Sequence, residues 1–251
     1  MNVTVPEDFS DITIRQYQNL IKAWDSTDDT REAALKTICA CCDLEMDLVK
    51  NASWSDIEKI VDMVTWLFET PDPSSLDLPL QNRFTLNEVT YGFIPDWTKL
   101  SVGEFADLET FSAKGAYQNL ECIIALVYRP IKEDKGYEYS IEDYAPSEKK
   151  NKIMLDCPMD VAVSAMLFFL SYRRGIGERY ASVFTSEGDE SEVGNKWGWY
   201  GIIHSLADGD LLKMDAITLI YIEEALTFLA YEKDVGMSDK INIDANSRRY
   251  K

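Results

Sequence analysis

The stretch RFTLNEVTYGF, residues 83–93, is where the hydrophobic pattern of this chain changes from helical to strand-like. Arg83–Leu86 and Val89–Phe93 alternate apolar and polar residues around Asn87-Glu88, a pair suited to a two-residue hairpin turn. Pro95 ends the second run, and Tyr137–Ile141 supplies a candidate third strand. The sequence therefore predicts one small antiparallel hairpin or three-stranded sheet in the middle of the chain.

On both sides of this stretch, apolar residues recur at the spacing of three and four that is typical of helices. Capping-box patterns mark helix starts at Thr13 with Gln16, at Ser55 with Glu58 and at Ser101 with Glu104. Further helices are expected over 30–42, 117–128, 161–172, 197–207 and 215–231. The prediction is a mainly α protein, a multi-helix globular bundle of about nine helices that carries the small sheet.

Two polar segments divide the chain. The segment 71–75 is rich in proline and serine, and 186–192 is a run of acidic and small residues. We therefore expect an N-terminal helical part (1–75), a central hairpin-plus-helix unit (76–185) and a C-terminal helical appendage with a tail (193–251). The tail, 235–251, lacks helical periodicity and is expected to be irregular.

Composition limits the classes of function. The chain has 251 residues, is 46% hydrophobic and carries a net charge of −19. Such a surface repels nucleic-acid phosphates and anionic lipid headgroups, so we expect neither nucleic acid nor membrane as a partner. The most apolar run, Val161–Leu170, is shorter than the ~20 residues of a bilayer-spanning helix. An odd number of cysteines and a start without the basic and apolar regions of an export signal favour a reducing, cytosolic compartment.

Candidate chemical groups are few. Cys39 and Cys42 have the Cys-x-x-Cys spacing of a redox pair or of half a zinc site. The sequence offers no second ligand pair, however, and the two thiols lie at a predicted helix end, where the dipole does not stabilise a thiolate. Small buried cysteines are the favoured interpretation here, and also for Cys41, Cys122 and Cys157. His204 is the single histidine and has no suggested nucleophile, so a structural role is favoured.

Acidic residues are too numerous to be diagnostic. Glu104, Asp107 and Glu109, or Glu142 and Asp143, could serve as the acid and base of a hydrolase. With 44 acidic residues in the chain, chance proximity is the expected explanation. Gly175-Ile176-Gly177 lacks the preceding strand of a dinucleotide loop and is expected to kink or end a helix. The sequence therefore predicts no catalytic, cofactor-binding or metal-binding residues, and a protein that is not an enzyme.

Two aromatic clusters are candidate partner-binding surfaces, because aromatic anchors supply much of the binding energy of protein interfaces. The first consists of Trp197, Trp199 and Tyr200, and the second of Tyr91, Phe93 and Trp97. Core packing is an equally good interpretation of the first cluster, so both stay open at this point.

Ordered motifs in the central region carry a resemblance. They are Phe84-x-Leu86, Tyr91-Gly92-Phe93-Ile94-Pro95-Asp96, Ser101-x-Gly103-Glu104-Phe105-x-Asp107-Leu108, Val127-Tyr128-Arg129-Pro130-Ile131 and Tyr139-x-Ile141-Glu142-Asp143-Tyr144. In this order the motifs resemble a group of tail- or neck-module proteins of tailed bacteriophages, among them tail assembly chaperones. The pattern extends over residues 10–172, and the central block contributes most of it.

The resemblance implies a non-enzymatic phage morphogenesis protein without a cofactor, most simply a tail assembly chaperone in the host cytoplasm. Such a chaperone coats the long, helical tape-measure protein until tail-tube subunits displace it. Tape-measure, tail-tube or neck components are therefore the implied partners, and self-association is a further option. Apolar grooves would hold partner helices while the net charge keeps the complex soluble. Two alternatives stay open, a structural protein of the virion neck or tail and an acidic antagonist of a basic host protein.

Overall fold

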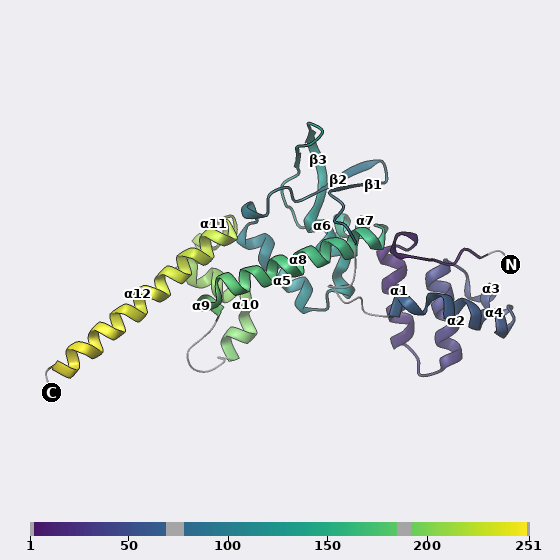
Figure 1. Cartoon of the computed structure of the whole chain (residues 1–251), viewed down its shortest axis with the longest axis horizontal. Helices are drawn as coiled ribbons and strands as arrows, with labels where there is room; N and C mark the ends of the chain where they lie inside the picture. Colours follow the sequence, from purple (N-terminus) through teal and green to yellow (C-terminus); the bar gives the residue numbers. More distant parts are fainter. Residues whose placement is uncertain (1–2, 69–77, 185–191, 250–251) are drawn as a thin grey trace. The chain divides into compact units, whose positions relative to one another are not determined.

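The computed structural model describes residues 3–68, 78–184 and 192–249, and these form twelve α-helices and one four-stranded antiparallel sheet (Figure 1). The predicted fold class, mainly α with a small central sheet, is confirmed. The helices are more numerous than predicted, and the sheet has one strand more. The proline-rich segment 71–75 and most of the acidic segment 186–192 lie outside the described residues.

The element bounds are as follows. The helices are α1 (Ile14–Asp25), α2 (Thr30–Cys42), α3 (Met46–Lys50), α4 (Trp54–Val64), α5 (Val102–Ala113), α6 (Leu120–Val127), α7 (Glu148–Met154), α8 (Met159–Arg179), α9 (Ala181–Phe184), α10 (Glu192–Leu206), α11 (Leu211–Thr218) and α12 (Ile222–Arg249). The strands are β1 (Arg83–Leu86), β2 (Val89–Phe93), β3 (Tyr128–Asp134) and β4 (Tyr139–Ile141).

The chain divides into two compact units that interleave in sequence. Unit 1 comprises Met1–Pro95 and Phe111–Phe169, and contains α1–α4, the sheet, α6, α7 and the first part of α8. Unit 2 comprises Asp96–Thr110 and Leu170–Lys251, and contains most of α5, the end of α8 and α9–α12. The sequence predicted three parts that follow one another along the chain, 1–75, 76–185 and 193–251. That these three parts are separate structural units stays a prediction.

The sheet of unit 1 has the strand order β1-β2-β3-β4, and Figure 1 labels its first three strands. In the β1–β2 hairpin, Asn87 and Glu88 have φ angles of 49° and 64°. Positive φ at both turn residues is the geometry that matches the twist of the flanking strands, and the hairpin is as predicted. β4 lies within the predicted third strand, 137–141. β3 was not predicted, because its first residue, Tyr128, was assigned to the end of a helix.

Gly92 gives the sheet a close contact that a larger residue would prevent. A Cβ atom at this position would lie 2.4 Å from Cε2 of Tyr139. The Tyr139 ring is held in place, since its hydroxyl donates to the carbonyl oxygens of Phe93 (2.8 Å) and Asn82 (3.0 Å). On the ring itself, the Arg83 guanidinium lies 4.6 Å from the centroid. Glycine at position 92 therefore lets the β4 tyrosine lie flat across β2.

Two of the predicted capping boxes are present. The Thr13 hydroxyl accepts from the Gln16 backbone N–H (3.2 Å), and the Gln16 side chain accepts from the Thr13 N–H (2.8 Å). Ser101 and Glu104 make the same reciprocal pair at 3.2 and 2.8 Å. These two helix starts are thus determined by local sequence.

The third predicted box, Ser55 with Glu58, is wrong. The N-cap of helix α4 lies two residues earlier, at Ser53, whose hydroxyl accepts from the Asp56 N–H (3.2 Å). The Glu58 carboxylate instead accepts a hydrogen bond from Nε1 of Trp54 (2.7 Å). Ser53 and Asp56 have the same spacing as the predicted pair, so the pattern alone could not choose between the two starts.

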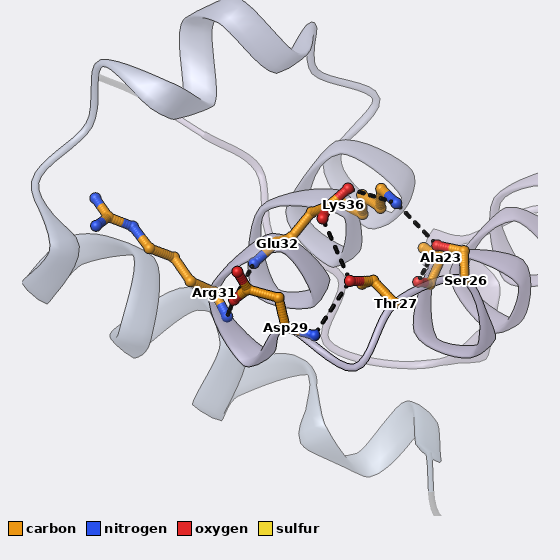
Figure 2. Close-up of polar contacts among 7 residues, drawn as sticks. All are labelled: Ala23, Ser26, Thr27, Asp29, Arg31, Glu32 and Lys36. Atoms are coloured by element: carbon orange, nitrogen blue, oxygen red, sulfur yellow. Dashed lines mark hydrogen bonds and ion pairs between the residues drawn. The ribbon is translucent and has the colours of Figure 1, made fainter.

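The connection between α1 and α2 is stabilised by polar contacts (Figure 2). Asp29 caps α2, because its carboxylate accepts from the N–H groups of Arg31 (2.8 Å) and Glu32 (3.3 Å). Lys36 reaches back from α2 and donates to the Ser26 hydroxyl (2.9 Å). Its hydrogen bond to Glu32 lowers the pKa of that carboxyl. The predicted helix 30–42 matches α2.

The predicted buried helix 161–172 lies within α8. In unit 1 its side chains Val161, Val163, Met166 and Phe169 are at most 3% exposed. They form part of the hydrophobic core of this unit, so burial is confirmed for these positions, whereas Phe168 and Leu170 of the same segment are exposed.

The C-terminal part corrects two predictions. The predicted helix 215–231 is interrupted between α11 and α12, because the backbone there bonds to another segment of unit 2. The Ile220 carbonyl accepts from the Val102 N–H (2.8 Å), and the Ile222 N–H donates to the Leu100 carbonyl (2.8 Å). The predicted irregular tail, 235–251, is also wrong, since α12 continues to Arg249.

Candidate partner-binding groove

The structure buries one of the two predicted aromatic clusters. Tyr91, Phe93 and Trp97 are 7%, 2% and 9% exposed. In unit 1, Tyr91 stacks on Phe84 with ring centroids 5.4 Å apart, while in unit 2 Trp97 packs against a neighbouring tyrosine. These three residues therefore form part of the cores of their units, and partner binding by them stays a prediction.

The other aromatic cluster is divided between surface and interior. Trp197 and Tyr200 are 50% and 51% exposed, and their rings lie 5.6 Å apart. Trp199 is half-buried and packs edge-on against Phe105 of α5 at 5.0 Å, with Phe184 of α9 at 6.4 Å. Partner binding by Trp197, Trp199 and Tyr200 stays a prediction, and Trp199 has a packing role in addition.

The backbone of Gly198 separates these two environments. Its φ of 46° and ψ of −126° interrupt α10, in a conformation that L side chains rarely adopt. The residues on either side consequently face different surroundings, with Trp197 half-exposed beside Tyr200 and Trp199 packed among other aromatic rings. The predicted helix 197–207 is thus part of a longer, kinked helix.

Trp199 forms one wall of an open groove that lies within unit 2. The groove has a volume of about 1210 Å³ and is bounded by segments of α5, α8, α9, α10 and α12. Its apolar walls include Phe105, Leu170, Phe184, Ile202 and Leu229. This volume exceeds the roughly 300–1,000 Å³ that is usual for a small-molecule site, so the groove suits a segment of polypeptide better.

Ionic groups lie on the α5–α8 side of the groove. The guanidinium of Arg173 makes a two-pronged contact with the carboxylate of Glu109, through Nε and through Nη2, the latter at 3.0 Å from Oε2. This hydrogen bonding raises the pKa of Arg173, so the arginine stays charged. Arg174 and Glu178 also line the groove, which leaves the lining charges balanced.

Two glycines leave room for a close approach along the groove. A Cβ atom added to Gly177 of α8 would meet nothing within 4 Å, and one added to Gly201 of α10 would meet only Cβ of Trp197 at 4.0 Å. Both positions line the groove. Small residues that face open space allow a partner backbone to come near, as in helix-in-groove recognition. Gly175 and Gly177 were expected to kink or end a helix, but α8 continues through both and ends at Arg179.

Two of the five cysteines, Cys41 and Cys157, are buried as predicted, and the other three are partly exposed. Cys39, Cys41 and Cys42 lie at the C-terminal end of α2, and burial raises the pKa of Cys41 to about 12. Burial likewise raises the pKa of Cys122 to about 11, and that of Cys157 further still. All five are free, and their ionisation is opposed by the protein.

The acidic candidates have structural contacts. Glu104 caps α5 and Glu109 pairs with Arg173, while Glu142 lies 3.0 Å from Lys150 and Asp143 lies 3.1 Å from Lys132. His204 is exposed on α10, and its carbonyl accepts the N–H of Gly209. Among the described residues, no group of three or more His, Cys, Asp or Glu side chains could hold a metal ion. Within the same residues, no helix is long and apolar enough to cross a bilayer.

The chain matches no protein-family model, no curated protein and no solved structure. The groove was also not foreseen from sequence, apart from Trp199. Leu170, Arg173, Arg174 and Gly177 recur at helical spacing on α8, and this mixed stripe is the signal that could have indicated a partly open helix face.

Proposed function

We propose that this protein acts by binding rather than by catalysis, as a phage morphogenesis protein of the tail-assembly-chaperone type that holds a helical segment of a partner in the groove of unit 2. The supporting observation is the groove itself, which is open, aromatic-walled and larger than a typical small-molecule site. The resemblance of the central motifs suggests the partner class, with the tape-measure protein of the tail as the first candidate.

The distribution of exposed apolar side chains favours unit 2 as the binding unit. Among the described residues, eleven of the eighteen exposed large apolar side chains belong to unit 2, although unit 1 contributes more of the chain. A contiguous exposed apolar patch commonly marks an interaction site, and in unit 2 the exposed rings of Trp197 and Tyr200 lie side by side with their centroids 5.6 Å apart. The net charge of −19 would keep the loaded and unloaded protein soluble in the host cytoplasm.

A matched pair of glycine substitutions tests the groove. Gly177→Leu places a side chain in the groove, whereas Gly175→Leu places one on the same helix at a position that does not line it. Both added Cβ atoms enter open space, and leucine is the better helix former by about 0.8 kcal/mol, so both variants should fold. When tagged protein is isolated from infected host cells, the partner should be missing from the Gly177→Leu variant and present with the Gly175→Leu variant. Equal capture by the two variants would refute the groove as the binding site.

Mass spectrometry of purified virions separates the chaperone from the virion-component alternative. A chaperone that is displaced during tail assembly should be missing from mature particles and present in lysates of infected cells. A stoichiometric amount in the particles would refute the chaperone role and would support a structural role in the neck or tail.

A further inference from the structure

A second surface of unit 2 lies on α11 and does not share a residue with the groove. Leu212 and Ala216 lie four residues apart on α11, and Leu219, the C-cap residue after the helix, continues the same face three residues later in a right-handed helical conformation. All three are exposed, Leu212 to 91% and Leu219 to 76%. Leu211 beside them is 73% exposed. An apolar stripe that faces solvent is the reverse of the usual orientation of an amphipathic helix.

The surroundings hold this face in position. Asp210 caps α11, since its carboxylate accepts from the Leu212 N–H at 3.0 Å. At the other end, Gly103 of α5 lies so close that an added Cβ would be 3.1 Å from both Cβ and the carbonyl oxygen of Thr218. The bonds of Ile220 to Val102 and of Ile222 to Leu100 anchor the turn that follows. The exposure of the leucines is thus a property of an anchored helix.

The segment that contains the stripe has mostly acidic charged residues. Asp208, Asp215 and Glu224 are exposed, and Asp215 lies three residues after Leu212 and four before Leu219. The one lysine of this segment, Lys213, is 3.6 Å from the carboxylate of Asp210. A positively charged partner would gain from these carboxylates, whereas a second copy of this chain would bring the same acidic groups and a net charge of −19.

We propose that the α11 face binds an apolar segment of a partner that is flanked by lysine or arginine residues. The leucines supply the apolar contact, and the surrounding carboxylates select for basic flanks. This inference rests on the proposed function in one respect, namely that the protein acts by binding. It concerns a surface other than the groove, and it states which kind of partner that surface would bind. Blocking the groove with Gly177→Leu should leave this contact intact, which keeps the two proposals separable.

Binding of designed peptides to the full-length protein tests the proposal. The first peptide is an amphipathic helix with leucines on one face and lysines along its flanks, and the second has glutamates in place of the lysines. Fluorescence anisotropy should show binding of the lysine peptide and at least tenfold weaker binding of the glutamate peptide. Leu212→Ala and Leu219→Ala should each lower the affinity for the lysine peptide about tenfold, as expected for the loss of a central apolar anchor. Asp215→Asn should also lower the affinity for the lysine peptide, and this loss of affinity should be smaller at high salt.

The control for non-specific attraction is Leu48→Ala, which removes a 49% exposed leucine from α3 of unit 1. Its affinity for the lysine peptide should equal that of the unsubstituted protein. Equal losses in Leu48→Ala and Leu212→Ala, or equal affinities for both peptides, would overturn the proposal. Light scattering measures whether the protein forms a dimer. A dimer that is abolished by Leu212→Ala would overturn the proposal, because the α11 face would then bind a second copy of this chain.

Discussion

Replacing Gly92 by alanine is expected to destabilise unit 1, because the new methyl group would occupy the position of the Tyr139 ring. The added Cβ would lie 2.4 Å from Cε2 and 2.8 Å from Cδ2 of this ring, well inside normal contact distance. Terminal ring atoms can usually move at low cost. Here the ring is held by its hydroxyl, which is shared between two carbonyl oxygens, and by the guanidinium of Arg83.

The magnitude follows from the contacts that the displaced ring would lose. The hydroxyl hydrogen bond contributes about 1 kcal/mol and the cation–π contact about 0.5–1 kcal/mol. Residual crowding in a packed site adds about 1 kcal/mol, while alanine gains about 0.5–1 kcal/mol over glycine in a strand. We therefore expect Gly92→Ala to lower the free energy of unfolding by about 2 kcal/mol.

A double-mutant cycle measured by urea denaturation tests this cause. In a Tyr139→Ala background the ring is missing, so Gly92→Ala should no longer destabilise unit 1 and should raise the free energy of unfolding by up to about 1 kcal/mol, the gain of alanine over glycine in a strand. A coupling of about 1.5 kcal/mol or more between positions 92 and 139 is the expected result. If Gly92→Ala cost the same with and without the tyrosine ring, the steric explanation would be refuted.

Two further predictions concern the N-terminal helices. Ser53→Ala removes the cap of α4 and should lower the free energy of unfolding by about 1 kcal/mol, whereas Ser55→Ala should change it by less than about 0.5 kcal/mol; thermal unfolding of both variants checks the order. Burial holds the pKa of Cys41 at about 12, above its ordinary value near 9, so folding favours the neutral thiol. Its contribution to stability is complete below about pH 9 and is lost as the pH rises toward 12. When the pH is raised from 8 to 10, the urea concentration at the unfolding midpoint should therefore fall by more in the unsubstituted protein than in Cys41→Ala. An equal fall in both proteins would contradict the raised pKa of Cys41.

The elements that local sequence determines were predicted well. Helix α2 matches its predicted range because Asp29 caps it and Asp43 ends it in a left-handed conformation, both within the segment. The β1–β2 hairpin was likewise recognisable, since its register and its turn depend on adjacent residues. Alternation and capping patterns are sufficient where the decisive contacts are close in sequence.

The elements that were not predicted correctly depend on contacts with segments that are distant in sequence. Strand β3 contains Pro130, and a proline argues against a strand. The structure accommodates it at the end of the ladder with β2, opposite Tyr91, before the pairing passes to β4. The break between α11 and α12 has no glycine or proline, and it depends on hydrogen bonds to residues 100 and 102. The groove was missed for the same reason, since five separate helices contribute its walls.

The placement of Trp199 has a spectroscopic consequence. Its indole forms part of the groove wall between Phe105 and Phe184, so an occupant would alter the polarity around it and shift its emission. The chain has six tryptophans, and replacing the half-exposed Trp24 of unit 1 by phenylalanine would lower the background signal without changing a predicted partner-binding residue. The protein therefore carries an intrinsic fluorophore with which occupancy of the groove can be titrated without any label.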